Sequence, residues 1–317
     1  MNAADPTIQR YLVTGGAGFI GSHVVDALMA RPGAHVSVFD HLTYAGSMAN
    51  LASHTDDPRF RFVRGDVAEM DDILPEVGAA DHVLHLAAES DIGRSLRGEQ
   101  IFLRTNALGT ACVLEACRQT RTPILVVSTD GVYGSGDETG WFNEEDPLRP
   151  SNPYAASKAG GDLLATAYHA TYGIDVTVVR GTNAYGPRQH AEKGIPTFIL
   201  AALERRPIPV YGDGHHRREW LYVTDWASAC LAILDRGSAG IVYNIGGGTE
   251  VTNLELAAQI CRLAGAPASL VSSVADRPAH DLRYGVAWER LASLGWSPEV
   301  SLPEGLAETV GWYAARL

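Results

Sequence analysis

The feature that most constrains this chain is a glycine-rich turn near its start. Residues 10–14 form an apolar run that predicts a strand, and an amphipathic run through Met29 predicts a helix. Gly15, Gly18 and Gly21 lie between them, at a spacing that lets backbone amides approach a pyrophosphate at the positive end of the helix. The glycines alone are weak evidence, but their place between strand and helix predicts a dinucleotide-binding unit.

The next predicted strand, at residues 35–39, ends in Asp40, nineteen residues after Gly21. A carboxylate at this place can accept hydrogen bonds from an adenosine ribose and repels a 2′-phosphate, which favours NAD over NADP. The alternative is that Asp40 only caps a turn.

Strands and helices continue to alternate as far as residue 180. Serial strand–helix units of this kind predict an α/β fold, a doubly wound parallel Rossmann sheet with helices on both faces. After residue 180 the elements become shorter and richer in Gly, Pro and Arg. We therefore expect an NAD-binding Rossmann domain with the catalytic residues at 1–180, and a smaller mixed α/β substrate-binding lobe, interleaved with the first, at 181–317. Further strands are predicted at 61–66, 82–86, 124–128 and 176–180, and helices at 101–119 and 154–172.

A candidate catalytic pair lies on the last of these helices. Ser151-Asn152-Pro153 is a helix-start signal, so Tyr154 and Lys158, four residues apart, are expected on one face. A cation near a phenol favours the phenolate, which can then act as a base at neutral pH. Taken alone, such a pair is more often an ordinary feature of a helix surface.

Composition restricts the class of partner. A formal net charge of −12 argues against binding to nucleic acid or to an anionic membrane. The four cysteines are scattered through apolar contexts without a ligand cluster, so we expect reduced core residues and no metal site. No apolar run reaches membrane-spanning length, and residues 1–10 lack the apolar centre of a signal peptide. These features predict a cytoplasmic protein with a small-molecule substrate.

Several longer motifs, taken with the glycines and the Tyr154–Lys158 pair, resemble the extended short-chain dehydrogenase/reductase family, and within it most closely the dTDP-glucose 4,6-dehydratases. The resemblance covers nearly the whole chain. Its motifs are Asp40-His41-Leu42-Thr43-Tyr44-Ala45-Gly46, Ala88-Glu89-Ser90, Ser128-Thr129-Asp130-x-Val132-Tyr133-Gly134, Asn183-Ala184-Tyr185-Gly186-Pro187 and the segment from Tyr211 to Val223 that contains Trp220.

The resemblance implies a role for each matching residue. Tyr154, with Lys158, would take the proton of the sugar C4 hydroxyl while hydride passes to NAD; Thr129 would bind the same hydroxyl, and Asp130 would help the C6 hydroxyl leave. It implies a homodimer formed through helices within 99–119 and 153–172, and no metal. The implied cofactor contacts are Gly15, Gly18, Phe19, Ile20, Gly21, Asp40, Asp66, Val67, Leu86, Ala87, Ala88, Asn106, Ser128, Tyr154 and Lys158. The implied substrate contacts, for a nucleotide sugar or a nucleoside, are Glu89, Ser90, Asp91, Asn183, Arg188, Arg218, Asn244 and Arg283.

Two departures from the family pattern concern the step that follows oxidation. The family has an Asp-Glu pair where this chain has Asp130-Gly131, and His-Val-Asp where this chain has Asp91-Ile92-Gly93. Loss of a positioned base costs roughly 10²- to 10⁴-fold in rate. Asp91 could replace the base or could be a solvated loop acid. We expect a reshaped site in which a glutamate at position 131 would be crowded.

Two functions are therefore open at this point. The first is a lyase that oxidises C4, loses water and returns the hydride. The alternative is an isomerase, a nucleotide-sugar C4 epimerase, which needs only Tyr154, Lys158, Thr129 and NAD. A binding protein without catalysis is disfavoured by the intact Tyr154–Lys158 pair.

Overall fold

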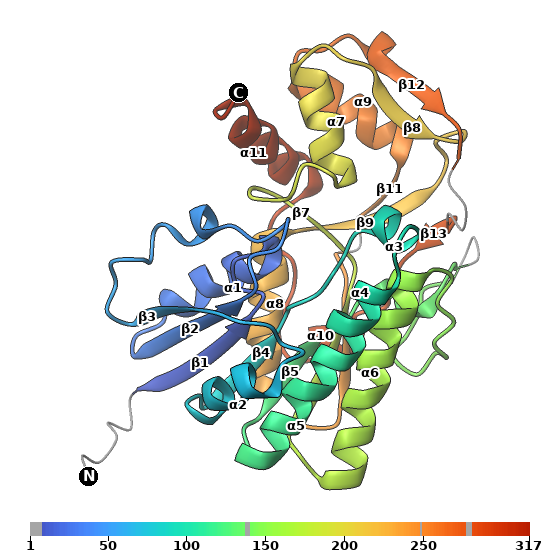
Figure 1. Cartoon of the computed structure of the whole chain (residues 1–317). Helices are drawn as coiled ribbons and strands as arrows, with labels where there is room; N and C mark the ends of the chain where they lie inside the picture. Colours follow the sequence, from blue (N-terminus) through green and yellow to red (C-terminus); the bar gives the residue numbers. More distant parts are fainter. Residues whose placement is uncertain (1–7, 137–139, 248, 277–280) are drawn as a thin grey trace.

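A computed structural model describes residues 8–136, 140–247, 249–276 and 281–317 (Figure 1). Its main sheet has seven strands in the order β10-β6-β5-β4-β1-β2-β3, and every neighbouring pair is parallel. The doubly wound fold class predicted from the sequence is thereby confirmed. The strands are Gln9–Thr14 (β1), Ala34–Asp40 (β2), Phe60–Arg64 (β3), His82–His85 (β4), Ile124–Val127 (β5), Val176–Gly181 (β6) and Val242–Ile245 (β10).

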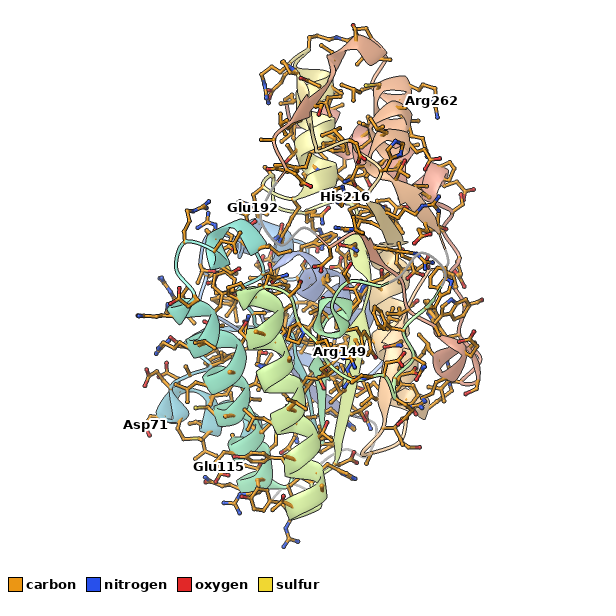
Figure 2. All side chains as sticks on the ribbon, turned by 90° about the vertical axis from the view of Figure 1, so that its right-hand side faces the viewer. Asp71, Glu115, Arg149, Glu192, His216 and Arg262 are labelled. Atoms are coloured by element: carbon orange, nitrogen blue, oxygen red, sulfur yellow. The ribbon has the colours of Figure 1, made fainter. Side chains whose placement is uncertain are left out.

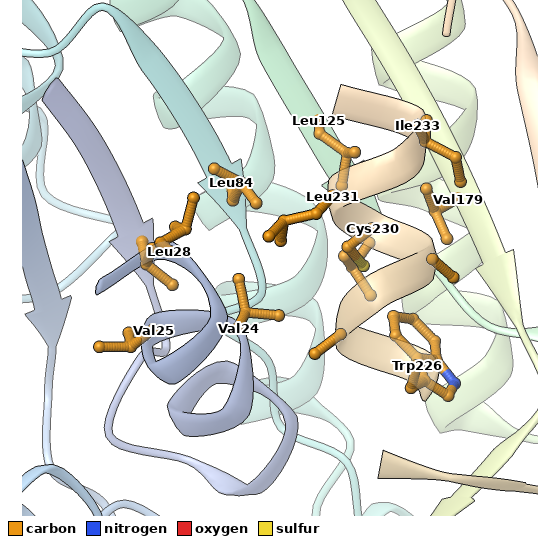
Figure 3. Close-up of a cluster of buried hydrophobic side chains, with 14 of the residues drawn as sticks. Val24, Val25, Leu28, Leu84, Leu125, Val179, Trp226, Cys230, Leu231 and Ile233 are labelled. Carbon is orange, nitrogen blue, oxygen red and sulfur yellow. The ribbon is translucent and has the colours of Figure 1, made fainter. Parts of the chain in front are cut away.

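Helices cover both faces of this sheet because successive residues of each strand point to opposite sides. On one face Val13, Leu84 and Leu125 pack with helices α1 and α8, as Figure 3 shows for Leu84 and Leu125. On the other face Leu12 and Val83, their chain neighbours, pack with α2, α5 and α6. The five helices are Phe19–Met29 (α1), Met70–Gly78 (α2), Thr110–Thr120 (α5), Pro153–Tyr172 (α6) and Val223–Arg236 (α8).

The smaller part of the molecule lies beyond the carboxyl ends of the main strands (Figure 1). Its strands are Asn183–Tyr185 (β7), Arg217–Tyr222 (β9), Glu250–Thr252 (β11) and Arg283–Tyr284 (β13) in one sheet, with Ile208–Tyr211 (β8) and Val271–Val274 (β12) in another. Its helices are Gly194–Leu203 (α7), Asn253–Leu263 (α9) and Leu302–Ala314 (α11), which share a core. Capping boxes, Thr252 with Glu255 and Ser301 with Glu304, begin α9 and α11.

The later half of the chain also contributes to the main sheet. After β9 the chain enters α8, which packs beside α1, and then β10, which pairs with β6 at the sheet edge. The Trp226 indole of α8 donates to the Thr182 carbonyl, 3.1 Å away, next to the end of β6. The two parts are thus joined by several crossings of the chain.

The predicted regular helix at 101–119 is interrupted in the structure. Gln100–Phe102 (α4) continues into a π-helical turn, Leu103–Gly109 (η2), before α5 begins. The wide turn contains Asn106, whose buried amide pairs with both peptide groups of Glu89 (2.9 Å each). Single π turns are frequent at functional sites, and this one connects the helix to the loop after β4. The short helices are Ile92–Ser95 (α3) and Glu289–Ala292 (α10), with 3₁₀ turns at Met48–Leu51 (η1), Asp130–Tyr133 (η3) and Ala268–Leu270 (η4).

Two sequence expectations concern what the chain does not carry. Among the described residues, none of the helices combines the length and apolarity needed to cross a membrane, and no cluster of three or more His, Cys, Asp or Glu could hold a metal ion. All four cysteines are free thiols, and Cys117, Cys230 and Cys261 are buried.

Candidate active site

A cleft of about 980 Å³ lies at the carboxyl ends of the main strands and is closed on the other side by the smaller part. This is where ligands bind in open α/β sheets, because the loops after the strands converge there. One wall carries the glycine-rich turn, the strand ends and the start of α6. The opposite wall carries residues such as Asn183, Tyr211 and Arg218.

The glycine-rich turn fits a pyrophosphate. Gly15 has φ +71°, and a Cβ there would lie 2.6 Å from the Ala87 amide nitrogen. A Cβ on Gly21 would collide with the Gly15 carbonyl, while α1 begins directly after Gly18. The turn therefore leaves room for a ligand at the N-terminus of α1, whose dipole favours an anion.

Asp40 lies at the ribose end of this groove. Its carboxylate accepts hydrogen bonds from the amides of Ala17 (3.0 Å) and Leu42 (2.8 Å), and burial raises its pKa while these bonds lower it. Both oxygens retain a second lone pair for a diol. The predicted cofactor residues Phe19, Ile20, Asp66, Val67, Leu86, Ala87, Ala88 and Ser128 also line the cleft. This chain therefore presents the groups that an NAD molecule requires.

The candidate catalytic residues meet where β5 ends and α6 begins. Thr129 caps the turn η3, and its hydroxyl donates to Asp130 Oδ1 at 3.0 Å. Asn152 caps α6 through the Ala155 amide at 2.9 Å, which sets the position of Tyr154 in the first turn. The Phe102 ring packs edge-on against the Tyr154 ring, with their centroids 6.4 Å apart. The structure brings Thr129, Asp130, Tyr154 and Lys158 together on the cleft wall.

The electrostatics of Tyr154 differ from the expectation. Burial and the Asp130 carboxylate raise the pKa of Tyr154 to about 12, although a hydrogen bond with Thr129 opposes the shift. Lys158 donates to the Val127 carbonyl at 2.5 Å, and burial lowers its own pKa to about 8. Burial, the Thr129 hydrogen bond and the Asp130 charge are the causes that act on the pKa of Tyr154, and Lys158 is not among them, so a phenolate favoured by Lys158 stays a prediction.

Asp130 is itself buried, with 5% of its surface exposed. Its Oδ1 accepts from Thr129, while its Oδ2 is buried without a hydrogen-bond partner. Burial raises the pKa of Asp130 to about 6, and the Arg218 charge and the Thr129 hydroxyl oppose the rise. A carboxyl on the cleft wall with one buried, unpaired oxygen is suited to exchanging a proton with a ligand.

Position 131 is not crowded at its first side-chain atom. A Cβ on Gly131 would meet Ala155 and Thr129 atoms at 3.7 Å, an ordinary contact distance, and the φ of Gly131 is not positive. The expected crowding by a glutamate therefore has no support at Cβ, and the backbone does not require glycine here.

The substrate end of the cleft contains five of the predicted contacts, Glu89, Ser90, Asp91, Asn183 and Arg218. Asp91 caps α3 through the Arg94 amide at 2.6 Å, so one of its oxygens already has a structural role. This disfavours Asp91 as the replacement base.

The cleft residues that were not predicted from the sequence include Arg94, His190, Glu192 and Lys193. Arg94 donates to Glu192 Oε2 at 3.1 Å, and Lys193 donates to the Ser90 carbonyl at 2.5 Å. These contacts join the loop after β4 to the loop before α7, and Figure 2 shows Glu192 near the boundary between the two parts. The polar stretch after Pro187 gave no signal of this pairing.

Four of the predicted residues do not line the cleft. Asn106 holds the Glu89 backbone from behind, and Arg188 pairs with Asp26 at 2.8 Å. Arg283 pairs with Glu250 at 2.5 Å. Asn244 accepts from the Tyr133 hydroxyl (2.8 Å) and donates to the carbonyls of Phe142 and Ala287, so its amide is fully used inside the protein. Their motif positions do not bring these side chains to the surface of the cleft.

The fold and the cleft together define a protein that binds a dinucleotide beside a tyrosine, a lysine and an acid. Residues 11–246 match the NAD dependent epimerase/dehydratase family, and the chain belongs to that family.

Curated relatives and solved structures agree with this assignment. A dTDP-glucose 4,6-dehydratase from Streptomyces niveus is 49% identical over 311 residues, covering 96% of this chain and 92% of its own. The crystal structure of a dTDP-glucose 4,6-dehydratase from Streptomyces venezuelae, with NAD bound, superposes with a TM-score of 0.94 at 47% identity and covers 97% of both chains. A UDP-glucose 4-epimerase from Thermus thermophilus, in complex with NAD, has a TM-score of 0.89 at 32% identity, covering 98% of this chain and 100% of its own.

Proposed function

We propose that this chain is an NAD-dependent dehydratase, a lyase that acts on a nucleotide-linked sugar. The observation that carries the proposal is Asp130, a buried carboxyl with an open oxygen that lies next to the Thr129 and Tyr154 hydroxyls. An epimerase has no use for such an acid, whereas loss of water from C6 needs one. The relatives named dTDP-glucose 4,6-dehydratase support the same reaction.

In the proposed reaction each residue has one task. Tyr154 takes the proton from the C4 hydroxyl, and Thr129 holds that hydroxyl by a hydrogen bond. NAD, when bound, would accept a hydride from C4 and later return that hydride to C6. A positive charge close to a phenol favours the phenolate, and oxidised NAD would bring such a charge into the cleft. Tyr154 would therefore be a better base with the cofactor bound than in the protein alone. Asp130 acts at C5 and C6, where water is lost.

In the proposed complex the substrate's phosphates lie against the cleft wall formed by the smaller part of the molecule. Arg218 is held by three backbone carbonyls, those of Arg217, Asp281 and Leu282, so its guanidinium has a fixed direction. Arginine in a fixed position suits phosphate because its donors form a planar fork. Asn183 lines the same wall and adds a neutral donor.

The C4 epimerase remains the second candidate because of one observation, that Gly131 places no side chain on the cleft wall next to Asp130. A keto sugar must turn over in the site before the hydride can return to its other face. Free volume next to Asp130 would permit that rotation.

Mass spectrometry of the products from a panel of substrates distinguishes the dehydratase from the C4 epimerase. Purified protein is incubated with NAD⁺ and nucleotide sugars, and we expect loss of one water from dTDP-glucose without stoichiometric release of NADH. An unchanged mass with a new C4 configuration would establish the epimerase. Absence of either product from every sugar would refute both.

We also propose a homodimer. The helices α4, η2 and α6 expose large apolar side chains: Ile101, Leu103 and Leu108 on the first two, and Leu163 and Tyr172 on α6. Figures 1 and 2 both show the segment from α4 to α5 running beside α6 on the outside of the molecule. A patch of this kind is typical of a buried interface between copies.

A further inference from the structure

Asp130 has an oxygen that the protein leaves unsatisfied. Oδ2 is buried and has no hydrogen-bond partner. The nearby Thr182 hydroxyl lowers the pKa of this carboxyl, but its proton is donated to the Glu219 carbonyl, 3.1 Å away. Buried polar atoms are almost always paired in native proteins, so an open one that lines a cleft indicates a group on the ligand.

Most other carboxylates of the cleft are committed elsewhere. Asp40 accepts two backbone amides, Asp66 pairs with Arg104 and the Ala68 amide, and Asp91 caps α3. Glu89 is hydrogen-bonded to Tyr44.

Among the described residues, Glu192 Oε1 is the other buried carboxylate oxygen without a hydrogen-bond partner. Its second oxygen is held by Arg94, and His190 Nδ1 lies 3.7 Å from Oε1. Asp130, in contrast, shares the Thr129 hydroxyl with Tyr154, so it lies within one side chain of the group that receives the C4 proton. C5 is one bond from C4, which places Asp130 and not Glu192 at the reacting carbons.

Resting on the proposed function, we propose that Asp130 is the base that removes the C5 proton, and that it returns this proton to the departing C6 hydroxyl. Oxidation at C4 acidifies the C5 hydrogen. Asp130 Oδ2 takes that proton, the C5–H electron pair becomes the C5–C6 double bond, and the C6–O bond breaks. The C6 oxygen takes the proton from Asp130 and leaves as water, which regenerates the carboxylate.

The later steps need no second acid from the protein, because water supplies the remaining proton. C6 takes back the hydride that C4 gave up, and C5 takes a proton from water. The hydroxide left by that water is neutralised by the proton that Tyr154 received from the C4 hydroxyl. A pKa of about 6 leaves Asp130 mostly ionised at neutral pH, the state that a base requires.

The test follows deuterium at C5. Wild-type protein with NAD⁺ and dTDP-glucose in D₂O should give a product that has lost water and carries deuterium at C5. With Asp130→Asn, we expect absorbance at 340 nm to rise as C4 is oxidised, while C5 exchange and water loss both fall at least about 100-fold. Glu192→Gln should retain C5 exchange. Thermal melting and NAD titration of both variants check that each folds and binds.

Three outcomes would overturn the inference. Exchange at C5 without loss of water in Asp130→Asn would show that Asp130 serves only the leaving hydroxyl. Exchange lost in Glu192→Gln and kept in Asp130→Asn would assign the base to Glu192. A wild-type exchange rate that does not fall on acidification through about pH 6 would exclude Asp130 without any variant. Absence of C4 oxidation and of water loss for every nucleotide sugar would instead refute the proposed function itself.

Discussion

Gly15 and Gly131 both line the cleft, and they differ in what the backbone requires of them. Gly15 has a left-handed φ and no space for a Cβ, because the Ala87 backbone lies against it. Gly131 has an ordinary backbone, and a Cβ there would meet its neighbours at 3.7 Å, an ordinary contact distance. A motif search treats both simply as glycines, while the structure separates a glycine that the backbone of the groove requires from one whose position can accommodate a Cβ.

Alanine at each position tests this difference. Gly15→Ala should destabilise the protein by about 1–3 kcal/mol, since it combines backbone strain with a clash, and should weaken NAD binding at least tenfold. Gly131→Ala is the matched control and should stay within about 0.5 kcal/mol of wild type. Urea unfolding and NAD titration measure both. Equal losses in the two variants would contradict the assignment.

Tyr154→Phe removes a proton acceptor and little else. We expect hydride transfer, and with it loss of water from the sugar as measured by mass, to be abolished, while NAD affinity stays within a few-fold. Tyr133→Phe is the control outside the cleft: it leaves the Asn244 carbonyl oxygen without its 2.8 Å partner and should cost about 1–3 kcal/mol of stability while turnover persists. Near-normal turnover by Tyr154→Phe would place the chemistry elsewhere.

At the scale of elements, β4 connects the cofactor turn to the π-helical turn through His85. Its Nδ1 lies 2.7 Å from the Thr14 hydroxyl and its Nε2 lies 3.0 Å from the Thr110 hydroxyl, which donates to the Asn106 carbonyl at 2.7 Å. Thr14 also accepts from the Ala87 amide at 3.3 Å. His85 is therefore neutral, with its proton on Nε2, and burial and Lys158 lower its pKa to about 3.

This buried histidine predicts a pH dependence of stability. Below about pH 6.5 the unfolded chain binds a proton at this position and the folded chain does not, so stability falls as pH drops from about 6.5 toward 3, by up to ~1.4 kcal/mol per pH unit. His85→Gln can keep both hydroxyl contacts without titrating, and its stability should fall less steeply. Urea midpoints between pH 4.5 and 7.5 measure the slopes. Parallel curves would rule out His85 as a source of the acid sensitivity.

For the whole molecule, local patterns predicted the first six strands in chain order, because each has apolar residues in a run or at alternate positions and is followed by a turn. They missed β10, since Val242–Ile245 lies about sixty residues after β6 and nothing local assigns it to that strand. They also missed His190, Glu192 and Lys193, which reach the cleft only because the two parts face each other. Tyr154 was predicted from its spacing to Lys158 on a helix, and Thr129 and Asp130 from the family resemblance; the structure gathers them where loops follow the parallel strands.

The proposed dimer makes a prediction at the same scale. Leu103→Glu combined with Leu163→Glu places charge in the exposed apolar patch and should shift the sedimenting species from dimer to monomer at micromolar concentration. Leu263→Glu alters a comparably exposed leucine on α9, away from these helices, and should leave the mass unchanged. A wild-type protein that sediments as a monomer would refute the dimer.

The place of β10 has a consequence for synthesis on the ribosome. When β6 emerges its outer edge has no partner, and the strand that covers it follows only after about sixty further residues. At about 5–20 residues per second the edge stays open for several seconds, a period in which another nascent chain can pair with it. The same delay keeps α8 from covering its face of the sheet. Newly made chains of this protein are therefore most exposed to misassembly after their cofactor-binding turn has been completed.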